Sequence, residues 1–145
     1  MLTQIVLGSA MIVVTTVIQG RFTLFGIERL RDHLAQHPAR SLVRSTLTLA
    51  AFVLWMFLAT IAEVWTWATL YLALGAVGTL EQAVYFSTVT FTTLGFGDIT
   101  LDERWRLLSS FEAANGLLIF GWSTALVFVA VRWVYRNDRE PGASR

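Results

Sequence analysis

Three long apolar stretches separated by polar segments set the pattern of the chain. The first covers residues 2–19 and contains no charged side chain. A helix rises about 1.5 Å per residue, so a stretch of this length just crosses ~30 Å of hydrocarbon. No basic residue precedes the stretch and no small-residue cleavage site follows it. Residues 1–20 are therefore predicted to form an uncleaved transmembrane helix rather than a signal peptide.

Residues 21–44 form a basic connector after this span. The connector carries five arginines, and its apolar residues fall roughly on one helical face. This pattern predicts a short amphipathic helix in the headgroup region that ends near Pro38; a solvated linker explains the composition nearly as well. His33 and His37 have a spacing that can hold a metal, although a wet, basic connector is the favoured interpretation.

A second apolar stretch, residues 45–77, is too long for one perpendicular crossing, so it must tilt or emerge from the bilayer on one side. Trp65, Trp67 and Tyr71 in its second half indicate an interfacial aromatic belt. Glu63 lies inside the stretch, where insertion of a carboxylate costs at least ~2.5 kcal/mol. Its side chain is therefore expected to face protein or water.

A short helix is predicted over residues 79–91, because Thr79-Leu80-Glu81-Gln82 matches a capping box. About a dozen helical residues cannot cross a bilayer, and this length suits a re-entrant helix buried among longer ones. Residues 92–98 follow as a non-helical loop, residues 107–133 form the last predicted span, and residues 136–145 form a polar tail.

Composition agrees with an all-α integral membrane protein of one domain. Of the 145 residues, 55% are hydrophobic and 14% are charged, whereas soluble domains are about 25% charged. The net charge of +1 gives no indication of nucleic-acid binding, and the absence of Cys excludes disulfides and thiolate metal sites. The sequence holds no nucleophile–base arrangement and no nucleotide-binding turn, so neither an enzyme nor a bound cofactor is expected.

The arginines predict the orientation in the cell membrane. Five lie in the connector and four lie from Arg132 onward, whereas the loop around residues 92–98 holds two arginines against four acidic residues. By the positive-inside rule, the connector and the C-terminus are predicted to be cytoplasmic, and the loop and the N-terminus are predicted to lie outside.

The backbone of residues 93–97, Thr-Leu-Gly-Phe-Gly, can supply oxygens to a cation that leaves water. Successive carbonyls point the same way only if the backbone dihedral angles alternate in sign from residue to residue. Such alternation requires positive φ values, which glycine tolerates. Gly95 and Gly97 occupy alternate positions, as this geometry requires. The Thr93 hydroxyl can add an oxygen at the inner end, and Asp98 adds negative charge at the outer mouth.

Two further expectations follow from this loop. Leu94 and Phe96 are expected to point away from the ion path and to wedge the loop against the short helix. The C-terminal end of that helix carries partial negative charge and would favour a cation beside it. One chain supplies one loop, so a closed ring around an ion path requires four copies, which predicts a homotetramer.

The segment Tyr85-Phe86-Ser87-Thr88-Val89-Thr90-Phe91-Thr92-Thr93-Leu94-Gly95-Phe96-Gly97-Asp98 closely resembles the pore helix and filter of potassium channels. Residues 115–125 resemble small bacterial proteins of the two-helix ion-channel family. The resemblance covers about residues 45–133. It implies a pore domain over residues 45–135, with an outer helix, a pore helix, a filter and an inner helix, plus one N-terminal transmembrane helix outside the minimal pattern.

The resemblance also implies site residues. The ion-coordinating oxygens of the K⁺ path would come from Thr93, Leu94, Gly95 and Phe96, with filter support from Thr92, Gly97, Asp98, Tyr85 and Phe86. Phe96 stands where tyrosine is commoner, Tyr85 and Phe86 stand where many relatives carry tryptophan, and Val89 stands where some carry glutamate. Fewer lateral hydrogen bonds predict a filter that inactivates readily or discriminates less sharply.

Four residues of the last span have two interpretations each. Gly116 and Gly121 suit either a gating hinge or close helix packing, and Ser123 and Thr124 suit either the lining of a cavity or helix packing. Glu63, Glu112 and Asn115 suit either a carboxyl network behind the filter that modulates gating or proton sensitivity, or a structural role as a buried hydrogen bond between the outer and inner helices or at an interfacial position, and the structural role is favoured. The favoured function is a passive K⁺-selective channel; the alternatives are a weakly selective monovalent cation channel and a non-conducting membrane scaffold or accessory subunit.

Overall fold

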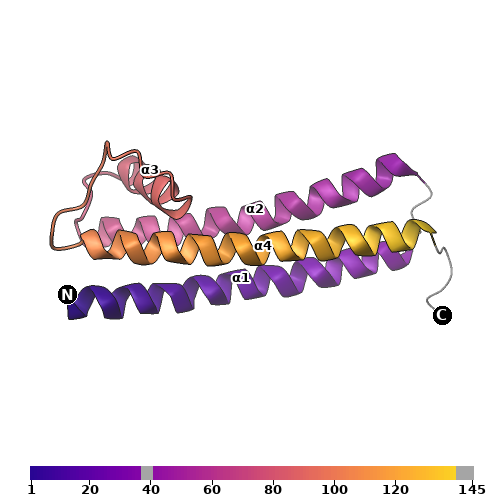
Figure 1. Ribbon diagram of the computed structural model, residues 1–145, viewed down its shortest axis with the longest axis horizontal. Helices are drawn as coiled ribbons and strands as arrows, with labels where there is room; N and C mark the ends of the chain where they lie inside the picture. The colour runs from indigo at the N-terminus through magenta and orange to yellow at the C-terminus, as the bar shows by residue number, and fades with distance from the viewer. Residues whose placement is uncertain (37–40, 140–145) are drawn as a thin grey trace.

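The computed structural model describes residues 1–36 and 41–139, which form four helices (Figure 1). They are α1 (Leu2–Gln36), α2 (Leu42–Ala73), α3 (Leu80–Phe91) and α4 (Arg106–Arg139). The described part of the chain contains no strand, and α1, α2 and α4 are each long and apolar enough to cross a membrane. The predicted all-α membrane fold is therefore confirmed.

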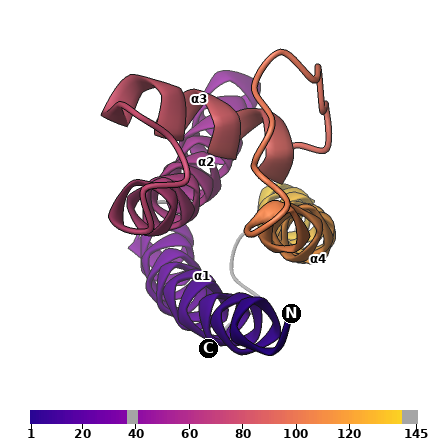
Figure 2. The same cartoon turned by 90° about the vertical axis from the view of Figure 1, so that its left-hand side faces the viewer.

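The three long helices run side by side, and the short α3 lies beside one end of them (Figure 1). The end-on view shows α1 and α3 on opposite sides of the α2–α4 pair (Figure 2). Helix α1 packs against α2 and α4, and α3 packs against the same two helices. Helices α2, α3 and α4 therefore pack against one another, and α1 packs on the side of the α2–α4 pair away from α3.

Helix α1 is continuous across Gly20, whereas the sequence pattern predicted a span to residue 20 and a separate element after it. A Cβ built on Gly20 would meet no atom within 4 Å, so this glycine marks no close approach. The change from apolar to charged residues at this point does not end the helix. The predicted end near Pro38 and the side chain of His37 lie outside the described residues.

The buried face of α1 is polar and small rather than apolar. Its buried positions recur at helical spacing and are Gln4, Gly8, Thr15, Gln19, Thr23, Gly26 and Leu30. A Cβ built on Gly8 would lie 2.6 Å from Cγ of Phe111 on α4, so Gly8 permits close contact between the two helices. This pattern is typical of helix interfaces in membranes, where small residues allow close approach and polar side chains bond across it.

The aromatic belt predicted on α2 is wrong for two of its three residues. Trp67 and Tyr71 are fully buried within the chain, while Trp65 is exposed. The Tyr71 ring meets Phe86 of α3 edge-on at 5.1 Å between centroids. These side chains therefore form the core that joins the outer helix to α3, and their positions follow from packing rather than from a membrane interface.

The cap of α3 is close to its prediction. The Thr79 hydroxyl accepts a hydrogen bond from the Gln82 amide at 3.2 Å, as predicted. The Gln82 side chain reaches back to the amide of Gly78 at 3.3 Å, one residue earlier than in the predicted capping box. Both bonds satisfy amides near the helix start, where the helix itself provides no acceptors.

Candidate functional site

The loop after α3 turns back against the end of that helix. The amides of Leu94 and Gly95 both donate to the carbonyl of Val89, at 2.9 and 3.3 Å, and the Thr93 amide donates to the Thr90 carbonyl at 2.9 Å. These bonds occupy carbonyls of the last turn of α3 that the helix leaves free. The loop is therefore fixed at the helix end by its own backbone.

The sign of the backbone angle φ alternates along this loop. Gly95 has φ 55° and Gly97 has φ 80°, as the glycine spacing predicted, and Thr93 has φ 61°. Thr93 is the one non-glycine with positive φ among the described residues. A side chain in this conformation costs roughly 1–2 kcal/mol, and such strain is typical of functional sites. Three alternate positions thus carry the sign change that an array of parallel carbonyls requires.

A side-chain bond holds the outer end of the loop. The Tyr85 hydroxyl on α3 donates to a carboxylate oxygen of Asp98 at 2.7 Å. The hydrogen bond to Asp98 raises the pKa of Tyr85 above its ordinary value. The sequence identified both residues as supports but not the bond between them. Phe96 has no hydroxyl, and the Tyr85 bond provides lateral support that the phenylalanine cannot.

The inner support of the loop also comes from the end of α3. The Thr92 hydroxyl donates to the Thr88 carbonyl at 2.7 Å, within the last turn of the helix. Phe86 is buried in a core cluster with side chains of α2 and α4. Thr92 therefore stabilises the helix terminus, and Phe86 anchors the helix body.

A buried hydrogen-bond network lies behind α3. The Tyr71 hydroxyl of α2 donates to one carboxyl oxygen of Glu112 at 2.7 Å, and the other oxygen lies within hydrogen-bond distance of the Ser87 hydroxyl. Ser87 also lies 2.8 Å from the carbonyl of Val64. One hydroxyl proton cannot serve both acceptors, so a proton on Glu112 would complete the set. Glu112 thereby joins α2, α3 and α4.

Glu63 is the other carboxyl group of the buried core. It is fully buried on α2, and neither of its oxygens has a hydrogen-bond partner among the described residues. The Trp67 indole N–H, one turn further along α2, also lacks a partner there. Glu63 therefore faces protein, as expected, but it takes no part in the Glu112 network.

Gly116 marks the closest contact between α4 and α3. A Cβ built on Gly116 would lie 2.0 Å from the carbonyl oxygen of Phe91, the last residue of α3. The Phe91 ring meets Phe120 of α4 edge-on at 5.9 Å between centroids. The same construction at Gly121 meets no atom within 4 Å. Gly116 thus allows α3 and α4 to pack closely within the chain, whereas Gly121 lies at no such contact.

Hydrogen bonds between described residues join α1 to α4. The Leu107 amide at the start of α4 donates to the Gln4 side chain at 2.9 Å, and Asn115 donates to the Thr15 hydroxyl at 2.7 Å. The Gln19 amide donates to the Ser123 hydroxyl at 2.9 Å. The hydroxyl of Ser123 is therefore directed at α1, which favours its packing interpretation.

Thr124 differs from its neighbour. Its hydroxyl donates to the Phe120 carbonyl of its own helix at 2.8 Å, and its side chain is exposed on the single chain. That Thr124 lines a cavity stays a prediction. Neither it nor Gly121 has a contact in this chain that assigns it another role.

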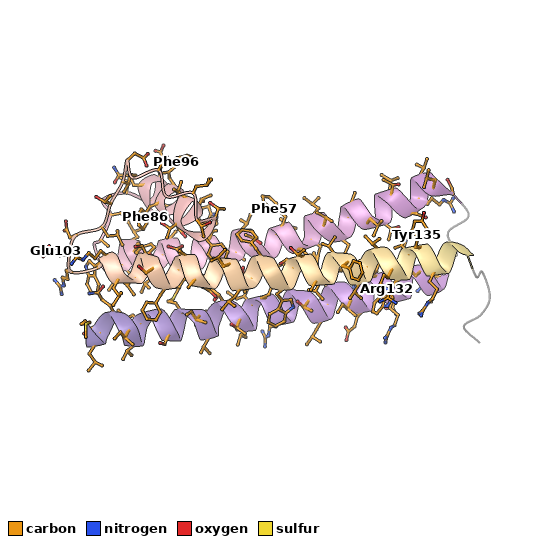
Figure 3. The ribbon with its side chains drawn as sticks, in the orientation of Figure 1. Phe57, Phe86, Phe96, Glu103, Arg132 and Tyr135 are labelled. Carbon is orange, nitrogen blue, oxygen red and sulfur yellow. The ribbon has the colours of Figure 1, made fainter. Side chains whose placement is uncertain are left out.

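Leu94 and Phe96 were expected to wedge the loop against α3. Within one chain they do not. Their side chains are 60% and 67% exposed. Figure 3 shows Phe96 at the outer edge of the loop, away from the three long helices.

Three apolar helices long enough to span a membrane, with a short helix and a strained glycine loop between the second and third of them, define an all-α integral membrane protein. A family model described as an ion channel matches residues 43–132, more than half of the chain. The chain therefore belongs to this ion channel family. The match covers α2, the loop and most of α4, and α1 lies outside it. The same comparisons give no match among curated proteins or solved structures.

Proposed function

We propose that this ion channel conducts K⁺ passively and selectively through a pore formed by four copies of the chain. The observation that carries the proposal is the alternation of positive φ at Thr93, Gly95 and Gly97, directly after the C-terminal end of a short buried helix. Backbone carbonyls in successive rings can replace the hydration shell of K⁺. The ions would be held by backbone oxygens of Thr93, Leu94, Gly95 and Phe96.

Assembly of four chains is part of the same proposal. Residues 93–98 are all exposed on the single chain, so one chain does not enclose an ion. The exposed side chains of Leu94 and Phe96 would then pack on a neighbouring chain. The bilayer, K⁺ and further copies of the chain are the proposed partners, with the C-terminus in the cytoplasm, the N-terminus outside, and the cell membrane as the location.

A flux assay tests conduction. Purified protein in liposomes should release K⁺ along its gradient faster than Na⁺, and barium should block the release. Gly95→Ala should abolish the flux, because alanine disfavours the positive φ that this position adopts. The matched control is Gly20→Ala, which places a methyl group in open space on α1 and should conduct as the parent does. Equal K⁺ and Na⁺ release would support the weakly selective alternative, and no release would support the scaffold.

The loop itself favours the weakly selective channel as the second candidate. Phe96 has no hydroxyl with which to hold the loop sideways, and the side chain is exposed in the chain. Reversal potentials under bi-ionic conditions, with Phe96→Tyr beside the parent, separate the candidates. A looser parent filter should gain selectivity and longer open times from the added hydroxyl; unchanged values would remove this candidate's support.

A further inference from the structure

The packing around α4 changes at Gly121. In the half of α4 nearer the loop, a Cβ built on Gly8 of α1 would lie 2.6 Å from the Phe111 ring. In the same half, Gly116 lies against the Phe91 carbonyl. A Cβ built on Gly121 would meet no atom within 4 Å, and a glycine weakens a helix interior because its backbone is less restricted. Gly121 therefore separates a closely packed outer half of α4 from an inner half with other contacts.

The Gln19 side chain of α1 bonds to α4 just beyond this glycine. Its amide nitrogen donates to the Ser123 hydroxyl at 2.9 Å. Gln19 is fully buried, and its amide oxygen has no hydrogen-bond partner among the described residues. Thr23, one turn further along α1, is also buried, and its hydroxyl likewise has no partner among them. The contact therefore leaves one acceptor and one donor unpaired on the same face of α1.

The corresponding contact nearer the loop is complete. The Thr15 hydroxyl donates to the Met11 carbonyl at 2.9 Å and accepts from the Asn115 amide at 2.7 Å. Thr15 and Thr23 belong to the same buried face of α1. Since buried polar groups are normally paired, the unpaired groups of Gln19 and Thr23 indicate a second arrangement, in which they meet each other.

We propose that Gln19 is a latch with two positions, one that holds the inner half of α4 against α1 and one that releases it. In the observed position the amide donates to Ser123. In the released position the amide turns along its own helix and accepts from the Thr23 hydroxyl, because side chains four residues apart are neighbours on a helix surface. Ser123 then donates to the carbonyl four residues earlier in α4, as serines in membrane helices do. The exchange replaces one hydrogen bond with others, so the two positions lie close in free energy.

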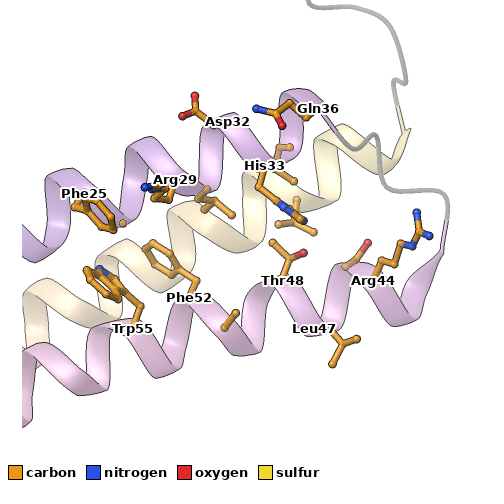
Figure 4. Close-up of a pocket in the computed structure, with 16 residues that line it drawn as sticks. Phe25, Arg29, Asp32, His33, Gln36, Arg44, Leu47, Thr48, Phe52 and Trp55 are labelled. Atoms are coloured by element: carbon orange, nitrogen blue, oxygen red, sulfur yellow. The ribbon is translucent and has the colours of Figure 1, made fainter.

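The packing beyond the latch allows the inner half of α4 to move. Val134 of α4 meets Leu30 of α1 in an apolar cluster. The Arg31 guanidinium lies 5.7 Å from the centre of the Trp133 ring. Neither contact has the directionality of a hydrogen bond, and lipid tails are as apolar as the side chains of the cluster. Residues of α1, α2 and α4 also line a cavity of about 730 Å³ at this end (Figure 4), which leaves space for a shift of the helices.

Gln19 is thus a positioning residue for the inner half of α4. In the proposed tetramer, the position of that half sets the width of the shared pore at the end opposite the loop, so the effect on conduction rests on the proposed function. Helix α1 lies outside the segment that the ion channel model matches. The latch is therefore an addition to the pore unit rather than a part of it.

Single-channel recordings of the full-length protein test the latch. Ser123→Ala removes the observed bond and should change the ratio of open to closed time by about threefold, and by no more than about eighteenfold, the range of hydrogen bonds between membrane helices. Thr23→Val removes the released bond and should change the ratio in the opposite direction. In a Gln19→Leu background neither change should have a further effect. The matched control is Thr15→Val, which alters a fully paired hydroxyl on the same face and should lower the unfolding midpoint without changing the ratio.

Spin-label distances within one chain test the movement without conduction. The chain contains no cysteine, so Leu24→Cys with Arg132→Cys places one label on exposed positions of α1 and of the inner half of α4. Labelled chains diluted with unlabelled parent in nanodiscs report the distance inside one chain. This distance should shift in opposite directions in the Ser123→Ala and Thr23→Val backgrounds. The control pair Val6→Cys with Leu117→Cys, in the outer half, should keep its distance.

The outcomes separate the latch from general packing and from the proposed function. Equal effects of Thr15→Val and Thr23→Val on the open-to-closed ratio would overturn the latch, as would changes in the same direction from Ser123→Ala and Thr23→Val. Identical spin-label distances in all backgrounds would also overturn it. Absence of conduction in every variant, with distances that shift as expected, would refute the proposed channel function and still support the latch.

Discussion

Gly116→Ala gives the sharpest test of how the inner helix supports the loop. The added methyl carbon would lie 2.0 Å from the Phe91 carbonyl oxygen, and ordinary van der Waals contact begins at 3.4 Å. Helices α3 and α4 would have to part by about 1.4 Å, because the obstacle is backbone and cannot rotate away. Overpacking of this kind costs about 1–3 kcal/mol, which corresponds to a midpoint lowered by roughly 3–10 °C for a chain of this size.

Thermal unfolding of the purified protein, followed by the fluorescence of its six tryptophans, measures this effect. Gly121→Ala is the matched control, since the same methyl group five residues further along α4 meets no atom within 4 Å. Alanine is also the better helix former by ~1 kcal/mol, so the control should unfold no earlier than the parent. Equal midpoints for the two variants would refute the packing role of Gly116. Equal losses of open probability with unchanged midpoints would instead indicate that both glycines act as hinges.

Three further changes test contacts around the loop. Tyr85→Phe removes the hydroxyl that donates to Asp98, so single-channel recordings should show shorter openings; unaltered open times would exclude a supporting role for this bond. Glu112→Gln should unfold within about 1 kcal/mol of the parent because an amide can both donate and accept, whereas Glu112→Ala leaves the buried Tyr71 hydroxyl without its acceptor and the Ser87 hydroxyl without its second partner, and should cost about 1–3 kcal/mol; identical denaturation curves for the two would contradict the network. A double-mutant cycle of Thr15→Val and Asn115→Leu should give a coupling of about 0.6–1.7 kcal/mol, and additive effects would show that their bond contributes nothing.

The fold was largely predictable because each long helix carries its own hydrophobic signal. A short helix after Thr79 followed from local capping chemistry, which acts over four residues and needs no tertiary information. The continuity of α1 was missed because a loss of hydrophobicity at Gly20 marks where lipid ends, whereas a helix continues as long as its backbone bonds and packing continue. The polar positions Gln4, Thr15 and Gln19 recur at helical spacing. That periodicity was the available sign that α1 packs on other helices along its whole length.

The loop was predictable in its glycines and less so in its neighbours. Alternate glycines reveal where positive φ occurs, but Thr93 adopts it as well, and no residue preference reports that. The bonds of Tyr71 and Ser87 to Glu112 join residues 41 and 25 positions apart, respectively. Such partners depend on the register of packed helices, which a single sequence does not define. The burial of Trp67 has the same origin, since an aromatic residue near a helix end suits a core as well as an interface.

The exposed loop has a consequence for assembly that does not depend on which ion passes. Residues 93–98 are all exposed on the single chain, and backbone groups without partners cannot face hydrocarbon at membrane depth. Lipid can cover apolar side chains of α4 such as Leu117 and Leu118, which are also exposed, but it cannot satisfy peptide carbonyls. The loop must therefore face either water or other chains. Residues of α1, α2 and α3 already pack on α4, so the remaining side is the one available to a shared pore. The proposed tetramer satisfies both requirements at once, because its axis carries water and ions past the same carbonyls that lipid would leave unpaired.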